Sequence, residues 1–246
     1  MDLGLSGKRA AVAAASQGLG LAVAEALARE GAAVAICGRT AATVDEAARR
    51  CGGVGIVQDV KDAAGGAAFV AAACDALGGV DILITNSGGP PAGDVAHTPV
   101  DAYLPAFELN ALSAIAMCDA AYPAMCAQGW GRIVAITSIA VRQPIANLAL
   151  SNTARAGLTG YLKTLAREIA SQGVTVNSLQ PGLHATQRLL ALHDGDVHAA
   201  AAHVPAGVVG DPSDFGSVAA FLCSESARFI TGAAIPVDGG AYGGLL

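Results

Sequence analysis

Apolar runs of strand length alternate with helix-like stretches along the whole of this 246-residue chain. The runs are continuously apolar, which is typical of strands buried on both faces of a parallel sheet. The stretches between them carry apolar residues at helical spacing, as in Leu21, Ala24 and Leu27. This alternation, without a linker-like segment, predicts one α/β domain over residues 1–246 with a doubly wound parallel sheet. Seven runs are expected to form its strands: Arg9 to Ala13, Ala33 to Cys37, Val54 to Val57, Val80 to Thr85, Gly131 to Thr137, Val174 to Leu179 and Ala233 to Val237.

The hydrophobic content, 53% of residues against 14% charged, is high enough to raise the question of a membrane protein. Much of it is alanine, and charges interrupt each candidate span, as Glu25 and Arg29 do after Gly20. A membrane-spanning helix needs about 20 consecutive apolar residues, so we expect no membrane association. The first residues, Met1 to Gly4, lack the basic and apolar regions of a secretory signal. A cytoplasmic location is therefore expected.

Charge and residue spacing also limit the partners that we expect. The chain has 14 Lys and Arg against 20 Asp and Glu, so it lacks the basic excess that binds nucleic acid. Its six cysteines form no C-x-x-C pair, which favours buried, reduced thiols over disulfides or a zinc site. Three histidines, His193, His198 and His203, recur every five residues, and this spacing returns to no common helix face. We therefore expect no metal site, and a small molecule is the expected substrate.

A turn of small residues joins the first predicted strand to a helix from Leu21 to Glu30. Glycines in such a turn let the backbone approach a pyrophosphate, and the N–H groups and dipole of the helix then hold the anion. The alternative is that the glycines only close a turn. The predicted phosphate-binding residues are Ala14, Ser16, Gln17, Gly18, Leu19 and Gly20.

The second predicted strand ends at Cys37-Gly38 and is followed by Arg39. A site selective for NAD usually has an acidic residue here, which bonds the ribose 2′-hydroxyl. A guanidinium instead pairs with a 2′-phosphate, so Arg39 favours NADP(H) over NAD(H). The alternative is a solvated surface arginine.

Six further motifs follow the predicted strands in sequence order: Gln58-Asp59-Val60, Thr85-Asn86-Ser87-Gly88, Asn110, Ile136-Thr137-Ser138, Asn177 to Gly182 with Thr186, and Val237-Asp238-Gly239-Gly240. With these motifs, the chain from about residue 7 onward resembles the short-chain dehydrogenase/reductase family, especially its 3-oxoacyl-carrier-protein-reductase-like branch. The resemblance implies a Rossmann fold and an oxidoreductase that uses a nicotinamide cofactor. It also implies homotetramers that assemble through the helices Asp101 to Gln128 and Leu150 to Gln172 and the C-terminal strand region.

The resemblance further implies roles for individual residues. Asn110 and Ser138 match members of the family's catalytic tetrad, and Asp59 and Val60 match the turn that holds adenine. The remaining matches to cofactor-binding positions are Asn86, Ser87, Gly88, Pro181, Gly182 and Thr186.

The chain departs from the family's motifs at two places. Ala14 stands where the first glycine of the phosphate turn is expected, and a methyl group there predicts a negative φ. The family's Tyr-x-x-x-Lys reads Ser151-Asn152-Thr153-Ala154-Arg155. Positions four apart share a helix face, so Ser151 and Arg155 are still expected to point together at the cofactor ribose.

These substitutions change the acid chemistry of the predicted site. A phenol has a pKa near about 10, whereas an aliphatic alcohol is closer to water at about 15.7, so Ser151 is a poor proton donor but can position a water. Arg155 stays charged, and it can hold the ribose hydroxyls or stabilise an oxyanion. His184, just after Pro181-Gly182, is the best substitute acid by position, and its alternative is a lid or surface histidine. Tyr161 is too far along the helix to substitute and is expected to pack.

Three functions are consistent with this sequence. The favoured one is an NADPH-dependent reductase of a carbonyl or a conjugated C=C, in which Asn110, Ser138, Ser151 and Arg155 organise hydride transfer and a water or His184 gives the proton. The alternatives are a redox-silent nucleotide-binding homologue and a non-redox isomerase or lyase. Apolar side chains predict a mostly apolar substrate pocket; they are Val141, Pro144, Ile145, Leu148 and Leu183. Arg142 or Arg188 could pair with a substrate anion, and the alternative for both is a surface role.

Overall fold

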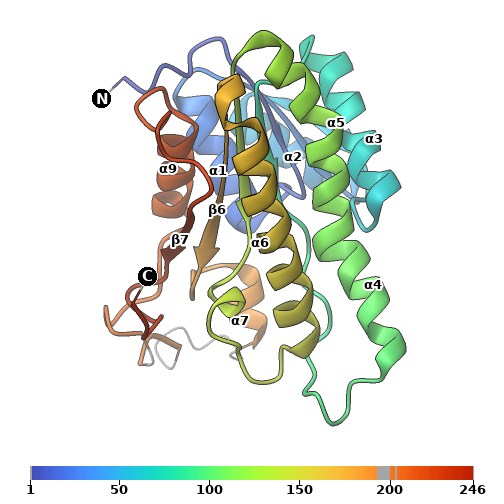
Figure 1. Cartoon of the computed structure of the whole chain (residues 1–246), viewed down its shortest axis with the longest axis vertical. Coiled ribbons are helices and arrows are strands. Elements are labelled where there is room, and N and C mark those ends of the chain that lie inside the picture. Colours follow the sequence, from blue (N-terminus) through green and yellow to red (C-terminus); the bar gives the residue numbers. More distant parts are fainter. Residues whose placement is uncertain (1, 193–199, 203, 246) are drawn as a thin grey trace.

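A computed structural model describes residues 2–192, 200–202 and 204–245. Its seven strands form one sheet in the order β3-β2-β1-β4-β5-β6-β7, and every neighbouring pair is parallel (Figure 1). This confirms the predicted Rossmann-type α/β fold, with strand ends that differ from the prediction by at most two residues. The strands are β1 (Arg9–Val12), β2 (Ala33–Gly38), β3 (Val54–Val57), β4 (Ile82–Thr85), β5 (Gly131–Ile136), β6 (Val174–Pro181) and β7 (Ala234–Val237).

Helices cover both faces of the sheet. One apolar core lies between the sheet and the helices α1 (Gly18–Arg29), α2 (Ala41–Cys51) and α9 (Pro212–Cys223). The other lies under α3 (Ala63–Leu77), α5 (Ser113–Gln128) and α6 (Ala149–Ile169). Successive strand residues alternate between the two cores, which is why the strands are apolar on both faces.

Small residues allow the helices to approach one another closely. A Cβ on Gly216 of α9 would clash with the carbonyl oxygen of Ala22 on α1, and one on Gly66 of α3 would clash with that of Ser113 on α5. Alanine and glycine thus serve the packing of helices inside a globular fold. In the part of the chain that the structure describes, no helix has the length and apolarity needed to cross a bilayer.

The predicted helix from Asp101 to Gln128 is not one regular helix. It consists of a 3₁₀ turn (η1, Val100–Ala102), a short helix (α4, Tyr103–Phe107), a π-helical turn (η2, Glu108–Leu112) and α5. A π turn holds one residue more than an α turn and is frequent at functional sites. Here it contains the buried Asn110, whose amide donates to the loop after β4. The remaining short elements are η3 (Ile139–Val141), η4 (Ala170–Gln172) and α7 (Gln187–Leu192).

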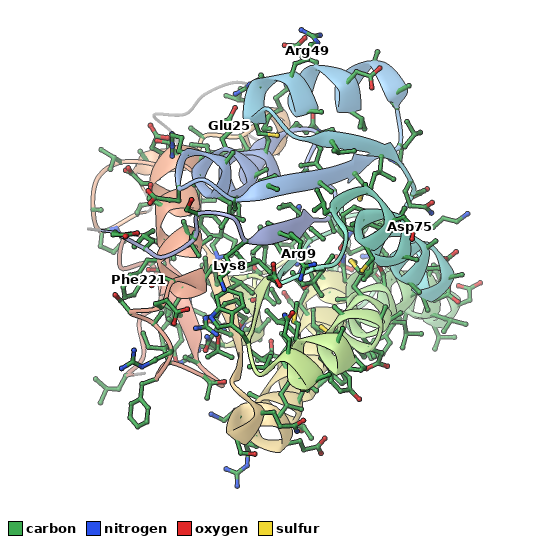
Figure 2. All side chains as sticks on the ribbon, turned by 90° about the horizontal axis from the view of Figure 1, so that it is seen from above. Lys8, Arg9, Glu25, Arg49, Asp75 and Phe221 are labelled. Carbon is green, nitrogen blue, oxygen red and sulfur yellow. The ribbon has the colours of Figure 1, made fainter. Side chains whose placement is uncertain are left out.

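Figure 2 views the molecule from above and labels Arg9, the first residue of β1, and Lys8 directly before it. Arg9 forms an ion pair with Asp81 at 2.7 Å. Trp130 has the Lys8 ammonium over its ring at 3.8 Å and the Arg132 guanidinium at 4.4 Å. These contacts belong to the end of the sheet opposite the loops in which a doubly wound fold binds its ligands.

Candidate active site

A cleft of about 860 Å³ lies over the carboxyl ends of the strands. Strand order reverses between β1 and β4, and a doubly wound sheet binds its ligand at such a point. The cleft wall draws on the loops after β1 through β6 and on α6 and α7. In Figure 1, β6 runs toward the end of the molecule at which α7 lies.

Nearly all of the predicted site residues line this cleft. The wall includes Ser138, Ser151 and every predicted cofactor residue except Gly20; the latter are Ala14, Ser16, Gln17, Gly18, Leu19, Arg39, Asp59, Val60, Asn86, Ser87, Gly88, Arg155, Pro181, Gly182 and Thr186. Gly20 lies behind the turn, because a Cβ there would be 2.8 Å from Asn86 Nδ2 and 2.9 Å from the Ala14 oxygen. Gly20 is therefore needed for packing. That the lining residues bind a cofactor stays a prediction.

The phosphate turn corrects one expectation. Ala14 has a φ of +46°, so the prediction of a negative φ was wrong. A left-handed conformation costs an L-residue about 1–2 kcal/mol, and here hydrogen bonds on both sides of Ala14 hold it. Its N–H donates to Cys37 Sγ at 3.3 Å, and its carbonyl accepts from Asn86 Nδ2 at 3.1 Å. Sequence reasoning missed Cys37, although it directly precedes the Gly38-Arg39 motif.

The cleft next to this turn offers groups that suit an anion. Gln17, at the N-cap of α1, makes no side-chain capping bond, so it leaves the first N–H groups of the helix uncapped beside the cleft. Arg39 is exposed and lines the cleft, and Lys61 adds a second cation to the wall. Lys61 was missed, although it directly follows Asp59-Val60. The β3 loop is held where Ser113 Oγ donates to the Val60 carbonyl at 2.7 Å.

Ser138, Ser151 and Arg155 line the part of the wall formed by β5 and α6. Ser151 and Arg155 are 7% and 9% exposed, and Arg155 Nε donates to Ser151 Oγ at 3.2 Å. Arg155 Nη1 donates to the carbonyls of Ile136 and Thr137, each at 3.1 Å, so the guanidinium is fixed to the end of β5. Because Arg155 donates to the Ser151 oxygen, the Ser151 hydroxyl keeps its own proton for donation.

Asn110 does not line the cleft. It is 2% exposed, and its Nδ2 donates to Ser87 Oγ and to the Gly88 carbonyl, both at 2.7 Å. Through these bonds it fixes the cleft-lining loop after β4. The catalytic role of Asn110 stays a prediction; what the geometry gives is its contact with Ser87 and Gly88.

His184 lines the cleft and is not a surface residue, because only 5% of it is exposed. Its ring meets that of Phe215 edge-on with centroids 5.2 Å apart and packs against Gly210, while Nδ1 lies 3.3 Å from the Gly182 carbonyl. Burial lowers the pKa of His184, and the opposing effects of Gly182 and Asp211 are smaller. The ring is then neutral at pH 7, which does not favour it as the acid; that role stays a prediction.

The remaining predicted residues agree only in part with the expectations; Tyr161 packs as expected. Tyr161 packs against the core away from the cleft, and its hydroxyl donates to Asp119 Oδ1 at 2.7 Å. Arg142 donates to the Ala234 carbonyl at 2.7 Å and does not line the cleft. Of the predicted apolar pocket, Leu148 and Leu183 line the wall, where Leu109 and Leu189 join them; Val141, Pro144 and Ile145 do not.

All six cysteines are free; four are buried, whereas Cys74 and Cys126 are half-buried. Within residues 2–192, 200–202 and 204–245, no group of three or more His, Cys, Asp or Glu is arranged to hold a metal ion. His193, His198 and His203 lie outside the described residues.

A parallel sheet with a glycine-containing turn at its switch point and a cleft over the strand ends defines a dinucleotide-binding α/β protein. Residues 13–242 match the family model described as Enoyl-(Acyl carrier protein) reductase. The 3-oxoacyl-[acyl-carrier-protein] reductase FabG of Vibrio cholerae is 36% identical over 246 residues, covering 98% of this chain and 99% of its own length. Dehydrogenase/reductase SDR family member 4 of Bos taurus is 34% identical, covering 98% and 89%.

Solved structures give the same result. L-sorbose reductase from Gluconobacter frateurii, complexed with NADPH and L-sorbose, superimposes with a TM-score of 0.92 at 31% identity, and the match covers 100% of both chains. The chain belongs to the short-chain dehydrogenase/reductase family, and its relatives include 3-oxoacyl-[acyl-carrier-protein] reductases.

The residues of the cleft fit a nicotinamide dinucleotide. Gly18, with a φ of +62°, is the first residue of α1, whose uncapped end supplies N–H donors for a pyrophosphate. Arg39 and Lys61 are cations, and Asp59 offers a carboxylate to an amino group. The cleft that contains Ser138 and Ser151 thus also contains hydrogen-bond donors, two cations and a carboxylate for a cofactor.

Proposed function

We propose that the chain is an NADPH-dependent reductase that transfers a hydride to a carbonyl, or to a C=C conjugated to a carbonyl, of a small and largely apolar substrate. The observation that carries this proposal is the continuity of the cleft. A single cleft is lined by Gly18 and Arg39 and also by Ser138, Ser151 and Arg155. A dinucleotide that lies in it has one end beside the cations and the other beside the three polar residues.

Individual residues would hold the cofactor as follows. The first N–H groups of α1 would bind the pyrophosphate, and Arg39 would pair with the 2′-phosphate, with Lys61 as a second positive charge. Asp59 and Val60 would hold adenine, and Arg155 would hold the ribose hydroxyls. When bound, the nicotinamide supplies the hydride.

The protein groups would act on the substrate oxygen. The hydroxyls of Ser138 and Ser151 would donate to that oxygen, which becomes an alkoxide or enolate as the hydride arrives at carbon. Arg155, whose guanidinium β5 holds in place, would stabilise the negative charge. A water positioned by Ser151 would give the proton, and the hydroxide left behind would be neutralised from bulk solvent.

The leucines of the cleft support an apolar substrate. Leu109, Leu148, Leu183 and Leu189 line the wall. An enone suits this site better than a simple ketone, because an enolate held by donors can be protonated after hydride transfer and needs no strong acid beside the oxygen.

A second function is favoured by one observation. Among the described residues that line the cleft, His184 is the one histidine, and burial lowers its pKa below that of a free imidazole. A site without a strong proton donor suits a redox-silent homologue that binds the nucleotide as a sensor or as a partner subunit. In that case NADPH binds but is not oxidised.

The test follows NADPH absorbance with purified protein against ketones, β-ketoesters and enones. The proposal expects turnover with an enone, a loss of turnover in Ser138→Ala and Arg155→Ala, and no change in the control Tyr161→Phe on the same helix. Tight binding of NADPH without oxidation would support the sensor. Product formed without consumption of cofactor would support an isomerase or lyase.

Titrations of NADPH and NADH test the choice of cofactor. Loss of a hydrogen bond to a charged group predicts that Arg39→Ala weakens NADPH binding by about tenfold or more and leaves NADH binding nearly unchanged. The control is Arg49→Ala, because Arg49 is an exposed arginine that pairs with Glu46 on α2. Equal affinity of wild type for NADH and NADPH would contradict the assignment.

We also propose a cytoplasmic homotetramer. Six free cysteines suit a reducing compartment. Exposed apolar side chains suit contacts between subunits: Val100 is 88%, Leu104 is 63% and Phe229 is 99% exposed. An apolar hollow of about 190 Å³ between α4 and α6 adjoins Leu104.

A further inference from the structure

Ala14 is the strained residue of the phosphate turn. Among the described residues other than glycine, only Ala14 and Asn147 have a positive φ, at +46° and +59°. Asparagine adopts this conformation readily because its short polar side chain bonds locally, whereas alanine has no such compensation. Something outside residue 14 must therefore hold the turn in this form.

The hydrogen-bond partners of Ala14 come from β2 and from the loop after β4. Cys37 lies on β2, and its Sγ accepts from the Ala14 N–H at 3.3 Å. Asn86 follows β4, and its Nδ2 donates to the Ala14 carbonyl at 3.1 Å. The next N–H, that of Ala15, donates to the Cys37 carbonyl at 2.8 Å. Cys37 thus contacts the two successive peptide groups at which the chain leaves β1 and turns.

The Cys37 thiol is part of the core of the fold. Its side chain is fully buried, and burial raises its pKa to about 12. The group that accepts from Ala14 is therefore the neutral thiol. Without the sulfur atom, the Ala14 N–H would lose its acceptor at a position where the backbone is already strained.

We infer that Cys37 is a positioning residue for the cofactor: its thiol, together with Asn86, holds Ala14 in the left-handed conformation that brings the phosphate turn to the cleft. This inference rests on the proposed function, because the turn matters for activity only through the nucleotide that it would hold. It has a specific consequence. Glycine adopts a positive φ without strain, so the turn should no longer depend on Cys37 once Ala14 is replaced by glycine.

The test is a double-mutant cycle of wild type, Cys37→Ala, Ala14→Gly and the double variant. The readouts are the Kd for NADPH from fluorescence titration and the Tm of the protein without ligand. Residues in direct contact couple, so we expect Cys37→Ala to weaken NADPH binding by about fivefold or more in wild type and by less than about twofold in the Ala14→Gly background. Cys37→Ala should likewise lower the Tm by less in the Ala14→Gly background than in wild type.

Two further variants separate positioning from packing. Cys223→Ala removes another fully buried thiol, on α9, and should lower the Tm while leaving the Kd unchanged. Cys37→Ser keeps an acceptor and should stay closer to wild type than Cys37→Ala. Cys37→Val, which has no acceptor and leaves a smaller cavity, replaces Cys37→Ala in the cycle if that variant does not fold. An equal loss of affinity in both backgrounds, with additive Tm changes, would overturn the inference.

Failure of the proposed function can be distinguished from failure of the inference about Cys37. If wild type binds neither NADPH nor NADH, the reductase proposal fails, and the coupling in Tm between positions 14 and 37 still decides the inference about the turn.

Discussion

Arg155 Nε donates to Ser151 Oγ at 3.2 Å, and both side chains line the cleft beside Ser138. The pair keeps the one-turn spacing that lets two side chains of a helix meet at one point. What it lacks is a group that ionises near neutral pH. The consequence is a site with donors for an oxyanion but with no strong acid of its own.

Restoring that acid is a direct prediction at this scale. We expect the double variant Ser151→Tyr with Arg155→Lys to reduce ketones about 10²-fold faster than wild type, since general acid catalysis contributes about 10²–10⁴-fold. Initial rates of NADPH oxidation measure the gain. Ser151→Ala is the control and should show none. A double variant that folds, binds NADPH and reduces ketones no faster would mean that more than the acid has been lost.

His184 predicts a pH dependence of stability. Its lowered pKa means that the folded chain binds this proton less tightly than the unfolded chain does. Its contribution is therefore fully present above the unfolded pKa of about 6.5 and is lost as the pH falls toward the lowered folded value. The Tm of wild type should drop between pH 7 and pH 5 more steeply than that of His184→Gln. Parallel pH profiles would show that His184 does not titrate as described.

At the scale of elements, periodicity predicted the seven strands well, because burial on both faces leaves a continuous apolar run. It did not predict the π turn at Asn110, because one extra residue in a helix does not visibly disturb an alanine-rich pattern. The left-handed φ of Ala14 was also mispredicted. Local sterics favour a negative φ, but Cys37 and Asn86, which lie 23 and 72 residues away in the sequence, decide the outcome.

For the site residues too, local motifs predicted some positions, whereas others depend on residues far away in the sequence. Motifs at strand ends indicated most of the cleft wall, because parallel strands end at one edge of the sheet. The burial of His184 depends on Phe215 and Gly210, whose proximity no local pattern indicates. Lys61 directly follows a recognised motif, and extending that motif by one residue would have found it. Cys37 stands in the strand end that was recognised, but no local pattern indicates that its thiol contacts Ala14.

Two helical glycines give a matched test of close packing. A methyl on Gly216 would clash with the Ala22 carbonyl between α9 and α1, whereas a methyl on Gly160 of α6 meets nothing within 4 Å. Gly216→Ala should lower the free energy of unfolding by about 1–3 kcal/mol through overpacking. Gly160→Ala should raise it by up to about 1 kcal/mol, because alanine favours the helix. Urea unfolding measures both, and a neutral Gly216→Ala would show that α1 and α9 can move apart.

At the scale of the whole molecule, the exposed apolar side chains of Val100 in η1 and Leu104 in α4 favour assembly. Light scattering at micromolar concentration should give the mass of a tetramer for wild type. Leu104→Glu should produce smaller species, because the charge would enter the contact between subunits. Val54→Glu, at the exposed edge strand β3, is the control and should leave the mass unchanged. A wild-type monomer would contradict the assembly.

The central claim is that this chain transfers a hydride although Ser151 and Arg155 stand in its active site. The most direct measurement uses NADPH deuterated at C4 of the nicotinamide, on each face in turn, with an enone as substrate and mass spectrometry of the product. The account predicts a product that gains one deuterium from one of the two labelled cofactors, and no such product with Arg155→Ala. Bound NADPH with unlabelled product, or with no product for any substrate of the panel, would contradict it.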